Sequence, residues 1–328
     1  MLEVNWGIIG CGNVTEIKSG PAFGKIQGSR VVAVMRRDGS KAKDYALRHN
    51  ISRWYDNADD LISDPGINAV YIATPPSSHA EYAIRSMEKG KVAYVEKPMA
   101  SNYDDCVRMS EVASRTQQPL YVAYYRRYLP YFIKVKELLS SGLLGDLLYA
   151  KIDFHIAPRP EDFNASDLPW RVIPETAGGG YFYDLACHQL DLLEWFFGKP
   201  VAASGKKYNT RKLYQAEDLV FGTIDYESGI PVNAQWCFAS GNKEHTDIIR
   251  IFGTSGTLEF STFDFTPIRM CTSELNEEYL PENPENIQYW FIKNMVEELR
   301  GINPGVGNRE SAMRTNRIMD ILLGKIKS

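Results

Sequence analysis

Apolar runs of strand length alternate with helix-patterned segments from the start of the chain to residue 124. The apolar runs cover residues 4–10, 30–35, 53–55, 69–73, 92–95 and 120–123. The helix-patterned segments cover residues 40–50, 78–89 and 102–116. Strands and helices that alternate in this way favour a parallel, doubly wound α/β sheet. The run at 53–55 is so short that we expect an edge strand there.

The pattern changes after residue 124. Helices are predicted over residues 130–141, 290–300 and 309–326, and strands over 147–156, 217–226, 230–239 and 246–252. In the third of these strands, apolar and polar side chains alternate with the period of a strand that is covered on one face. Its apolar set is Val232, Ala234, Trp236 and Phe238. We expect one face of the sheet to pack on a helix and the other to meet a second copy of the chain.

A glycine-rich turn follows the first predicted strand. Gly10 and Gly12 enclose Cys11, and Asn13 and Val14 lead into a helix. A Gly-x-Gly turn between a strand and a helix lets the backbone approach a pyrophosphate group, whose charge the helix N-terminus stabilises. The third glycine of the usual fingerprint is replaced by Thr15. The turn therefore predicts a dinucleotide site with one departure from the common pattern.

The end of the second strand indicates which dinucleotide is bound. An acidic residue there holds the ribose 2′-hydroxyl of NAD, whereas an arginine accommodates the 2′-phosphate of NADP. Here the strand ends in Arg36 and Arg37, followed by Asp38. We therefore expect NADP(H) to be favoured over NAD(H). Asp38 is better placed to cap the next helix than to hold a ribose.

The end of the fourth strand adds further candidates, since open parallel sheets bind ligands at the carboxyl ends of their strands. Thr74 closes this strand, and Pro75 keeps the following chain extended. Ser77 or Ser78 is expected to cap the next helix. His79 is interpreted as a helix-start residue beside the site rather than as a catalyst.

Two segments carry candidate proton chemistry. Lys97 follows the fifth strand, and three glycines at 178–180 precede a helical pattern, which suits a place where backbone passes close to something else. Asp184 and His188 share one face of that helix, with Asp191 three residues further along. A lysine at a strand end and an Asp and a His on one helix face predict a proton-handling site.

Composition limits the class of protein. A net charge of −4 without a long basic run argues against a nucleic-acid surface, and the apolar runs are far shorter than the roughly 20 residues of a membrane helix. The beginning of the chain lacks the pattern of a secretory signal. The five scattered cysteines include no Cys-x-x-Cys pair, which favours reduced thiols in a cytoplasmic protein and no metal site.

Taken together, these segments resemble the Gfo/Idh/MocA oxidoreductases, the family of glucose-fructose oxidoreductase and inositol dehydrogenase. The resemblance rests on residues 7–12 (GIIGCG), 74–79 (TPPSSH), 96–98 (EKP), 170–171 (WR) and 178–191 (GGGYFYDLACHQLD). It implies a dinucleotide-binding Rossmann domain over residues 1–124. It also implies a substrate-binding and oligomerisation α+β domain with a large, mostly antiparallel open sheet over residues 125–328.

By position, the resemblance makes Lys97, Asp184 and His188 catalytic and implies a cis bond between Lys97 and Pro98. The matching cofactor-side positions are Gly10, Gly12, Thr74 and Glu96. With the residues next to them, the candidate cofactor-binding set also includes Asn13, Val14, Arg36, Arg37, Pro75, His79 and Lys97. The candidate substrate-binding set is Lys97, Tyr125, Arg127, Trp170, Arg171, Tyr183, Asp184 and His188.

The implied activity is NAD(P)-dependent hydride transfer at a secondary alcohol or carbonyl of a sugar, polyol or related cyclic alcohol. A histidine accepts and returns a proton near neutrality, which suits His188. A charged Lys97 stabilises a developing alkoxide. Which of the two carries the proton stays open, as does whether Asp184 orients His188 or binds a neighbouring hydroxyl.

Three alternatives remain. The first is a non-catalytic, sugar-sensing regulator of the same fold, which the joint presence of Lys97, Asp184 and His188 disfavours. The second is a lyase or glycosidase that retains NAD and regenerates it. The third is a metal site at His188, Asp184 and Asp191, for which the chain offers no further ligand spacing. We expect a homodimer or homotetramer formed through the C-terminal sheet.

Overall fold

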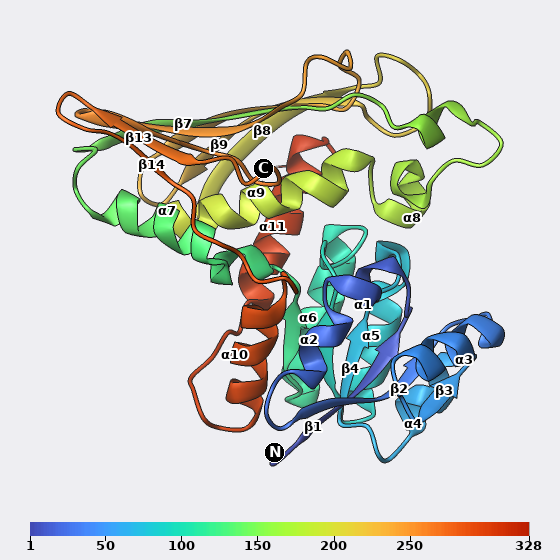
Figure 1. Ribbon diagram of the computed structural model, residues 1–328. Coiled ribbons are helices and arrows are strands. Elements are labelled where there is room, and N and C mark those ends of the chain that lie inside the picture. Colours follow the sequence, from blue (N-terminus) through green and yellow to red (C-terminus); the bar gives the residue numbers. More distant parts are fainter. Residues whose placement is uncertain (328) are drawn as a thin grey trace. The chain divides into compact units, whose positions relative to one another are not determined.

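A computed structural model describes residues 1–327 and divides the chain into two compact units (Figure 1). The first unit consists of Met1–Tyr125 and Pro284–Met313. The second consists of Arg126–Asn283 and the chain from Arg314 onward. The first unit therefore receives a segment from far along the sequence, and each unit is described by itself below.

The first unit contains a parallel sheet of six strands in the order β3-β2-β1-β4-β5-β6. The strands are β1 (Val4–Ile9), β2 (Ser29–Met35), β3 (Arg53–Tyr55), β4 (Ala69–Ile72), β5 (Val92–Val95) and β6 (Leu120–Val122). The predicted doubly wound sheet is confirmed, with the 53–55 strand at its edge. The strand order reverses between β1 and β4, the point at which such sheets bind ligands.

The helices of this unit with predicted bounds are α3 (Gly39–Arg48), α5 (His79–Glu88), α6 (Tyr103–Thr116) and α10 (Tyr289–Leu299), and each begins and ends within about two residues of its prediction. Helix α1 (Asn13–Ile17) follows the glycine turn as expected, whereas α2 (Gly20–Gly24) and α4 (Ala58–Ser63) were not predicted. Ser78 stands at the N-cap of α5, but its hydroxyl donates to Thr74 Oγ1 at 2.8 Å and to Pro75 O at 3.0 Å. The expected side-chain cap by Ser78 is therefore wrong, because the hydroxyl closes the preceding turn instead.

The second unit contains a sheet of eight strands in the order β14-β13-β12-β11-β7-β10-β9-β8. Among the described residues every neighbouring pair is antiparallel except β7 and β10, which confirms the mostly antiparallel open sheet. The strands are β7 (Leu147–His155), β8 (Pro200–Tyr208), β9 (Leu219–Tyr226), β10 (Pro231–Cys237), β11 (Thr246–Gly253), β12 (Gly256–Phe260), β13 (Ile268–Thr272) and β14 (Asn276–Tyr279).

Helices α7 (Pro130–Ser140) and α9 (Tyr181–Phe197) lie along one face of this sheet (Figure 1). The Trp236 indole N–H donates to Gln189 Oε1 at 2.6 Å, and the Trp236 and Phe182 rings lie 5.0 Å apart. These contacts confirm that the alternating strand packs its apolar face on the helix that carries His188. The remaining helices are α8 (Pro174–Ala177), α11 (Arg309–Leu322) and the 3-10 turns η1 (Pro76–Ser78), η2 (Tyr125–Tyr128), η3 (Pro160–Phe163) and η4 (Trp170–Val172).

Candidate active site

The glycine turn after β1 combines a tight approach with open space. Gly10 has φ +91°, and a Cβ there would lie 2.8 Å from Thr74 Cγ2 and 2.9 Å from the Ala73 carbonyl carbon. A Cβ at Gly12 would have Gly10 O, 3.9 Å away, as its nearest atom. Only glycine fits position 10, whereas the backbone at Gly12 keeps free space beside it. That space suits the close approach of a dinucleotide phosphate.

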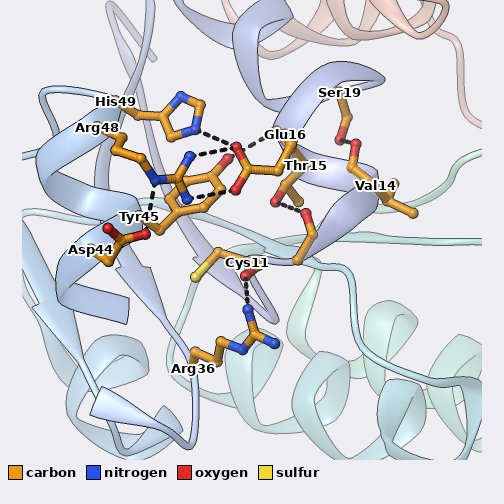
Figure 2. Close-up of polar contacts among 11 residues, drawn as sticks. Cys11, Val14, Thr15, Glu16, Ser19, Arg36, Asp44, Tyr45, Arg48 and His49 are labelled. Atoms are coloured by element: carbon orange, nitrogen blue, oxygen red, sulfur yellow. Dashed lines mark hydrogen bonds and ion pairs between the residues drawn. The ribbon is translucent and has the colours of Figure 1, made fainter. Parts of the chain in front are cut away.

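Thr15 explains the departure from the glycine fingerprint (Figure 2). Its hydroxyl donates to Gly12 O at 2.8 Å, and its own carbonyl accepts from the Tyr45 hydroxyl at 2.9 Å. The side chain is fully buried. A glycine at position 15 would lack both the hydroxyl hydrogen bond and the buried side chain, so Thr15 stabilises the turn and the start of α1. Asn13 and Val14 are the first two residues of that helix.

A network missed from the sequence fixes α1 to α3. Glu16 accepts from Arg48 Nη2 at 2.7 Å and Nη1 at 2.9 Å, and His49 Nε2 lies 2.8 Å from the same carboxylate (Figure 2). The Arg48 hydrogen bonds, followed by that of His49, lower the pKa of Glu16 to about 2. Asp44 holds Arg48 from the other side at 2.8 Å. The partners lie 32 and 33 residues apart, so no local pattern reveals them.

The end of β2 places Arg36 beside the glycine turn. Its Nη1 lies 3.4 Å from Cys11 O (Figure 2). Arg36 and Arg37 are both exposed. Asp38 is the N-cap of α3, where its carboxylate accepts from Ser40 N at 3.1 Å and Lys41 N at 3.3 Å. The interpretation of Asp38 as a cap is therefore confirmed.

His79 ties the end of β4 to the chain that follows β5. The imidazole is fully buried, with Nδ1 3.0 Å from Pro98 O and Nε2 2.7 Å from Thr74 O. Burial lowers the pKa of His79, while the two carbonyl contacts act in the opposite direction. His79 is the first residue of α5, as expected, and it holds Thr74 and Pro98 in place. Pro75, the residue directly after Thr74, is half-buried.

A buried carboxylate stands directly before Lys97. Glu96 Oε1 accepts from the Tyr71 hydroxyl at 2.5 Å and from Gln288 Nε2 at 2.7 Å, and Glu96 Oε2 lies 3.3 Å from the Lys97 backbone N–H. Gln288 comes from the segment that returns to this unit near α10. The bond between Lys97 and Pro98 is cis, as the resemblance implied. Lys97 itself is half-buried.

The second glycine turn is filled by the chain itself. A Cβ at Gly179 would lie 2.8 Å from Glu217 Oε1, and one at Gly180 would lie 2.7 Å from Glu217 O. The Gly180 N–H donates to Glu217 Oε1 at 2.7 Å. Burial raises the pKa of Glu217, and the Gly180 N–H opposes that rise. The expected close approach of backbone is confirmed. The residue that contacts the glycines is Glu217, which lies just before β9 and which the sequence did not indicate.

Helix α9 carries Asp184 and His188. Asp184 Oδ2 accepts from Arg171 Nε at 3.1 Å, and the Arg171 guanidinium lies 4.4 Å from the centre of the Trp170 ring. His188 is 3% exposed, and its ring lies 5.9 Å from that of Phe263. The structure thus brings together three of the predicted residues, Asp184, Arg171 and Trp170.

Other predicted site residues sit in buried polar contacts. Arg127 makes a bidentate ion pair with Asp191, at 2.9 Å and 2.7 Å, one turn beyond His188. The Tyr183 hydroxyl donates to Asp320 Oδ1 at 2.7 Å. Tyr125 is 6% exposed. These contacts anchor α9, and a role of Arg127, Tyr183 or Tyr125 in binding substrate stays a prediction.

The loop over residues 157–168 is fastened to α9. Asp162 is fully buried, and its carboxylate accepts from the Tyr181 hydroxyl at 2.7 Å and from the Arg159 N–H at 2.8 Å.

Across residues 1–327, no group of three or more His, Cys, Asp or Glu side chains is placed to hold a metal ion. In the same part of the chain, every helix is too short or too polar to cross a membrane.

Comparisons with known proteins agree on the class. Residues 4–124 match the model of the oxidoreductase family with an NAD-binding Rossmann fold, and residues 132–259 match that of the GFO/IDH/MocA C-terminal domain. The protein named Oxidoreductase P35 from Formosa agariphila is 40% identical over 98% of this chain and 99% of its own length. The chain therefore belongs to the GFO/IDH/MocA oxidoreductase family.

Two more distant relatives carry specific names. The scyllo-inositol 2-dehydrogenase (NAD(+)) of Bacillus subtilis is 25% identical over 79% of this chain and 74% of its own length. A structure of levoglucosan dehydrogenase with NADH and levoglucosan has a TM-score of 0.85 at 18% identity and covers 98% of this chain and 96% of its own. At that identity the second similarity shows the fold alone.

Proposed function

We propose that this NAD-binding oxidoreductase transfers a hydride between nicotinamide and a secondary alcohol or carbonyl of a sugar, polyol or related cyclic alcohol. The observation that carries the proposal is the anchored helix α9, which holds the buried His188 and the half-buried Asp184 on one face. The name of the inositol dehydrogenase supports this substrate class. A cytoplasmic location and separate cofactor-binding and substrate-binding domains belong to the same proposal.

The residues of the first unit fit a dinucleotide. The free space beside Gly12 accommodates a phosphate, and the braced start of α1 keeps that space open. We assign the 2′-phosphate of NADP to Arg36 and Arg37, because a charge-assisted pair to phosphate contributes about 1.5–3 kcal/mol. Affinities for NADP and NAD, measured in parallel by calorimetry, should differ at least about tenfold in favour of NADP. Equal affinities would refute the assignment of Arg36.

When bound, nicotinamide supplies the hydride acceptor or donor. The chain must then bind the alcohol, take up its hydroxyl proton and stabilise the developing alkoxide. We assign proton handling to His188 and Lys97 and leave open which of them carries the proton. Asp184, held by Arg171, orients His188 or binds a neighbouring hydroxyl.

A panel of sugars, inositols, keto-sugars and dihydrodiols assayed with NADP(H) and NAD(H) tests this function. Turnover with a net change in nicotinamide absorbance supports a dehydrogenase or reductase. Turnover without that change, from cofactor that co-purifies with the protein, would favour the lyase or glycosidase alternative. Cofactor binding without turnover of any compound would favour the regulator.

The outer face of the second sheet supports an oligomer. On the face away from α9, Tyr149 stacks on Phe252 with ring centres 4.4 Å apart, and Phe221 and Tyr208 are exposed. Exposed aromatic side chains on an open sheet are typical of a contact with another chain. We propose a homodimer or homotetramer through this face. A monomeric mass in solution at micromolar concentration would exclude it.

A further inference from the structure

A loop between β12 and β13 (residues 261–266) is built around one buried carboxylate. Asp247 on β11 is 5% exposed, and it accepts hydrogen bonds from three successive backbone N–H groups. The donors are Thr262 N at 2.9 Å, Phe263 N at 2.5 Å and Asp264 N at 3.0 Å. Successive N–H groups that converge in this way form an anion-binding nest, here filled by the protein's own side chain.

Further contacts hold the same loop. The Tyr131 hydroxyl donates to Thr266 O at 2.7 Å, and Arg126 Nη1 donates to Thr262 O at 2.7 Å. Phe265 takes φ +49°, a conformation that bulky L residues rarely adopt. The contacts of the loop must therefore offset a local backbone cost, which is common where a loop has to present one side chain in a set position.

The side chain presented is Phe263. Its ring lies 5.9 Å from the His188 ring at an interplanar angle of 71°, and 5.3 Å from that of Phe154. The guanidinium of Arg126, itself 5% exposed, lies 4.7 Å from the centre of the Phe263 ring. Edge-to-face contacts of this kind restrict both rings. Phe263 is therefore held by its loop, by Phe154 and by Arg126, and it packs on His188.

We propose that Phe263 is a positioning residue for His188 and that Asp247 acts through it. The inference rests on the proposed function, in which His188 handles a proton. Misplacement of a reacting group by about 1 Å costs up to ~100-fold in rate, so a rigid aromatic wall beside the imidazole has a direct effect on turnover. Asp247 fixes the backbone from which Phe263 extends.

Four variants test the inference by steady-state kinetics and cofactor titration. We expect Phe263→Ala to lower kcat about tenfold with unchanged cofactor affinity, and Phe263→Tyr to restore kcat to within about twofold. Asp247→Asn keeps the shape of the side chain but loses its charge, and it should lower kcat by a similar factor. Tyr279→Ala at the end of β14 is the control loss of an aromatic ring in the same unit, because the Tyr279 ring lies against Lys134 rather than against the 261–266 loop, and it should leave kcat unchanged.

The double variant Asp247→Asn/Phe263→Ala decides whether Asp247 acts through Phe263. A kcat no lower than that of Phe263→Ala alone supports the inference, and multiplied losses would overturn it. Hydrogen exchange of Asp247→Asn should be faster at residues 262–264 and unchanged in the rest of the second unit, and the unchanged part shows that the folded protein was tested. If His188→Asn is inactive while Phe263→Ala is fully active, the positioning role of Phe263 is wrong and the proposed function stands. If His188→Asn remains fully active, the proposed function itself fails.

Discussion

The turns at residues 10–12 and 178–180 both lead into a helix, but they use glycine for different purposes. At Gly12 an added Cβ would meet open space, with its nearest atom 3.9 Å away. At Gly180 it would meet Glu217 O at 2.7 Å. The first turn keeps room for something that is not protein, whereas the second is closed by the chain. Glycine in a motif therefore indicates a ligand site only when the protein leaves the space beside it open.

The helices that follow show the same difference. Helix α1 has five residues and is braced mainly by Thr15 and by the half-exposed Glu16 network. Helix α9 has 17 residues and is anchored by buried groups, among them Glu217, Asp162 and Arg127. A segment that must admit a cofactor is held at its edge. Helix α9, which carries the proposed proton-handling His188, is held along its length.

The largest effect is expected from Gly180→Ala. The new Cβ would lie 2.7 Å from a backbone oxygen, which has to move, and overpacking of this kind costs about 3 kcal/mol. Chemical denaturation measures the loss in free energy of unfolding. Gly241→Ala in the same unit is the control, because its Cβ would meet its nearest atom at 3.8 Å. If the two variants are equally stable, the close packing at Gly180 is wrong.

Gly12→Ala, in contrast to Gly180→Ala, should weaken cofactor binding and leave stability unchanged. The protein has room for the methyl group, so its unfolding should be unchanged, but the methyl group occupies the space assigned to the dinucleotide. We expect a loss in cofactor affinity of at least about tenfold, measured by titration. Gly24→Ala on α2, where a Cβ meets nothing within 4 Å, should keep full affinity. Unchanged affinity in Gly12→Ala would place the cofactor elsewhere.

Glu16→Gln should give the smallest effect, and one that depends on pH. The folded-state pKa of Glu16, about 2, lies below its ordinary value of 4.5. The stability it contributes is therefore present above pH 4.5 and lost as the pH falls towards 2. Because the pair is half-exposed and screened by solvent, we expect a loss of about 1 kcal/mol at neutral pH. Denaturation of both proteins near pH 2 should remove the difference, and a constant difference would exclude the pair as its source.

Local patterns predicted much of the fold. The alternation at Val232, Ala234, Trp236 and Phe238 gave the buried face of β10, because side chains on a strand point to the two faces in turn. Strand β8 was missed since most of its side chains are exposed, which leaves no apolar alternation. The hydrogen bond from Gln288 to Glu96 joins residues that are 192 positions apart in the sequence, and no local pattern encodes such a contact.

The candidate site was predictable only in part, for the same reason. Lys97, Asp184 and His188 were selected as candidates because their residue types and spacing carry chemistry. The residues that hold them were not found. Glu217, Asp247 and Phe263 have no motif of their own, and each acts through a contact made by the folded chain. Sequence reasoning therefore identified candidate reacting groups better than the groups that position them.

The turnover of Lys97→Met tests the central claim most directly, because methionine keeps the length of the side chain and removes its charge. We expect cofactor affinity within about threefold of the unmodified protein and a loss of turnover of at least ~100-fold, the scale of a removed proton-handling or charge-stabilising group. Turnover that survives in Lys97→Met with the cofactor bound would contradict the account.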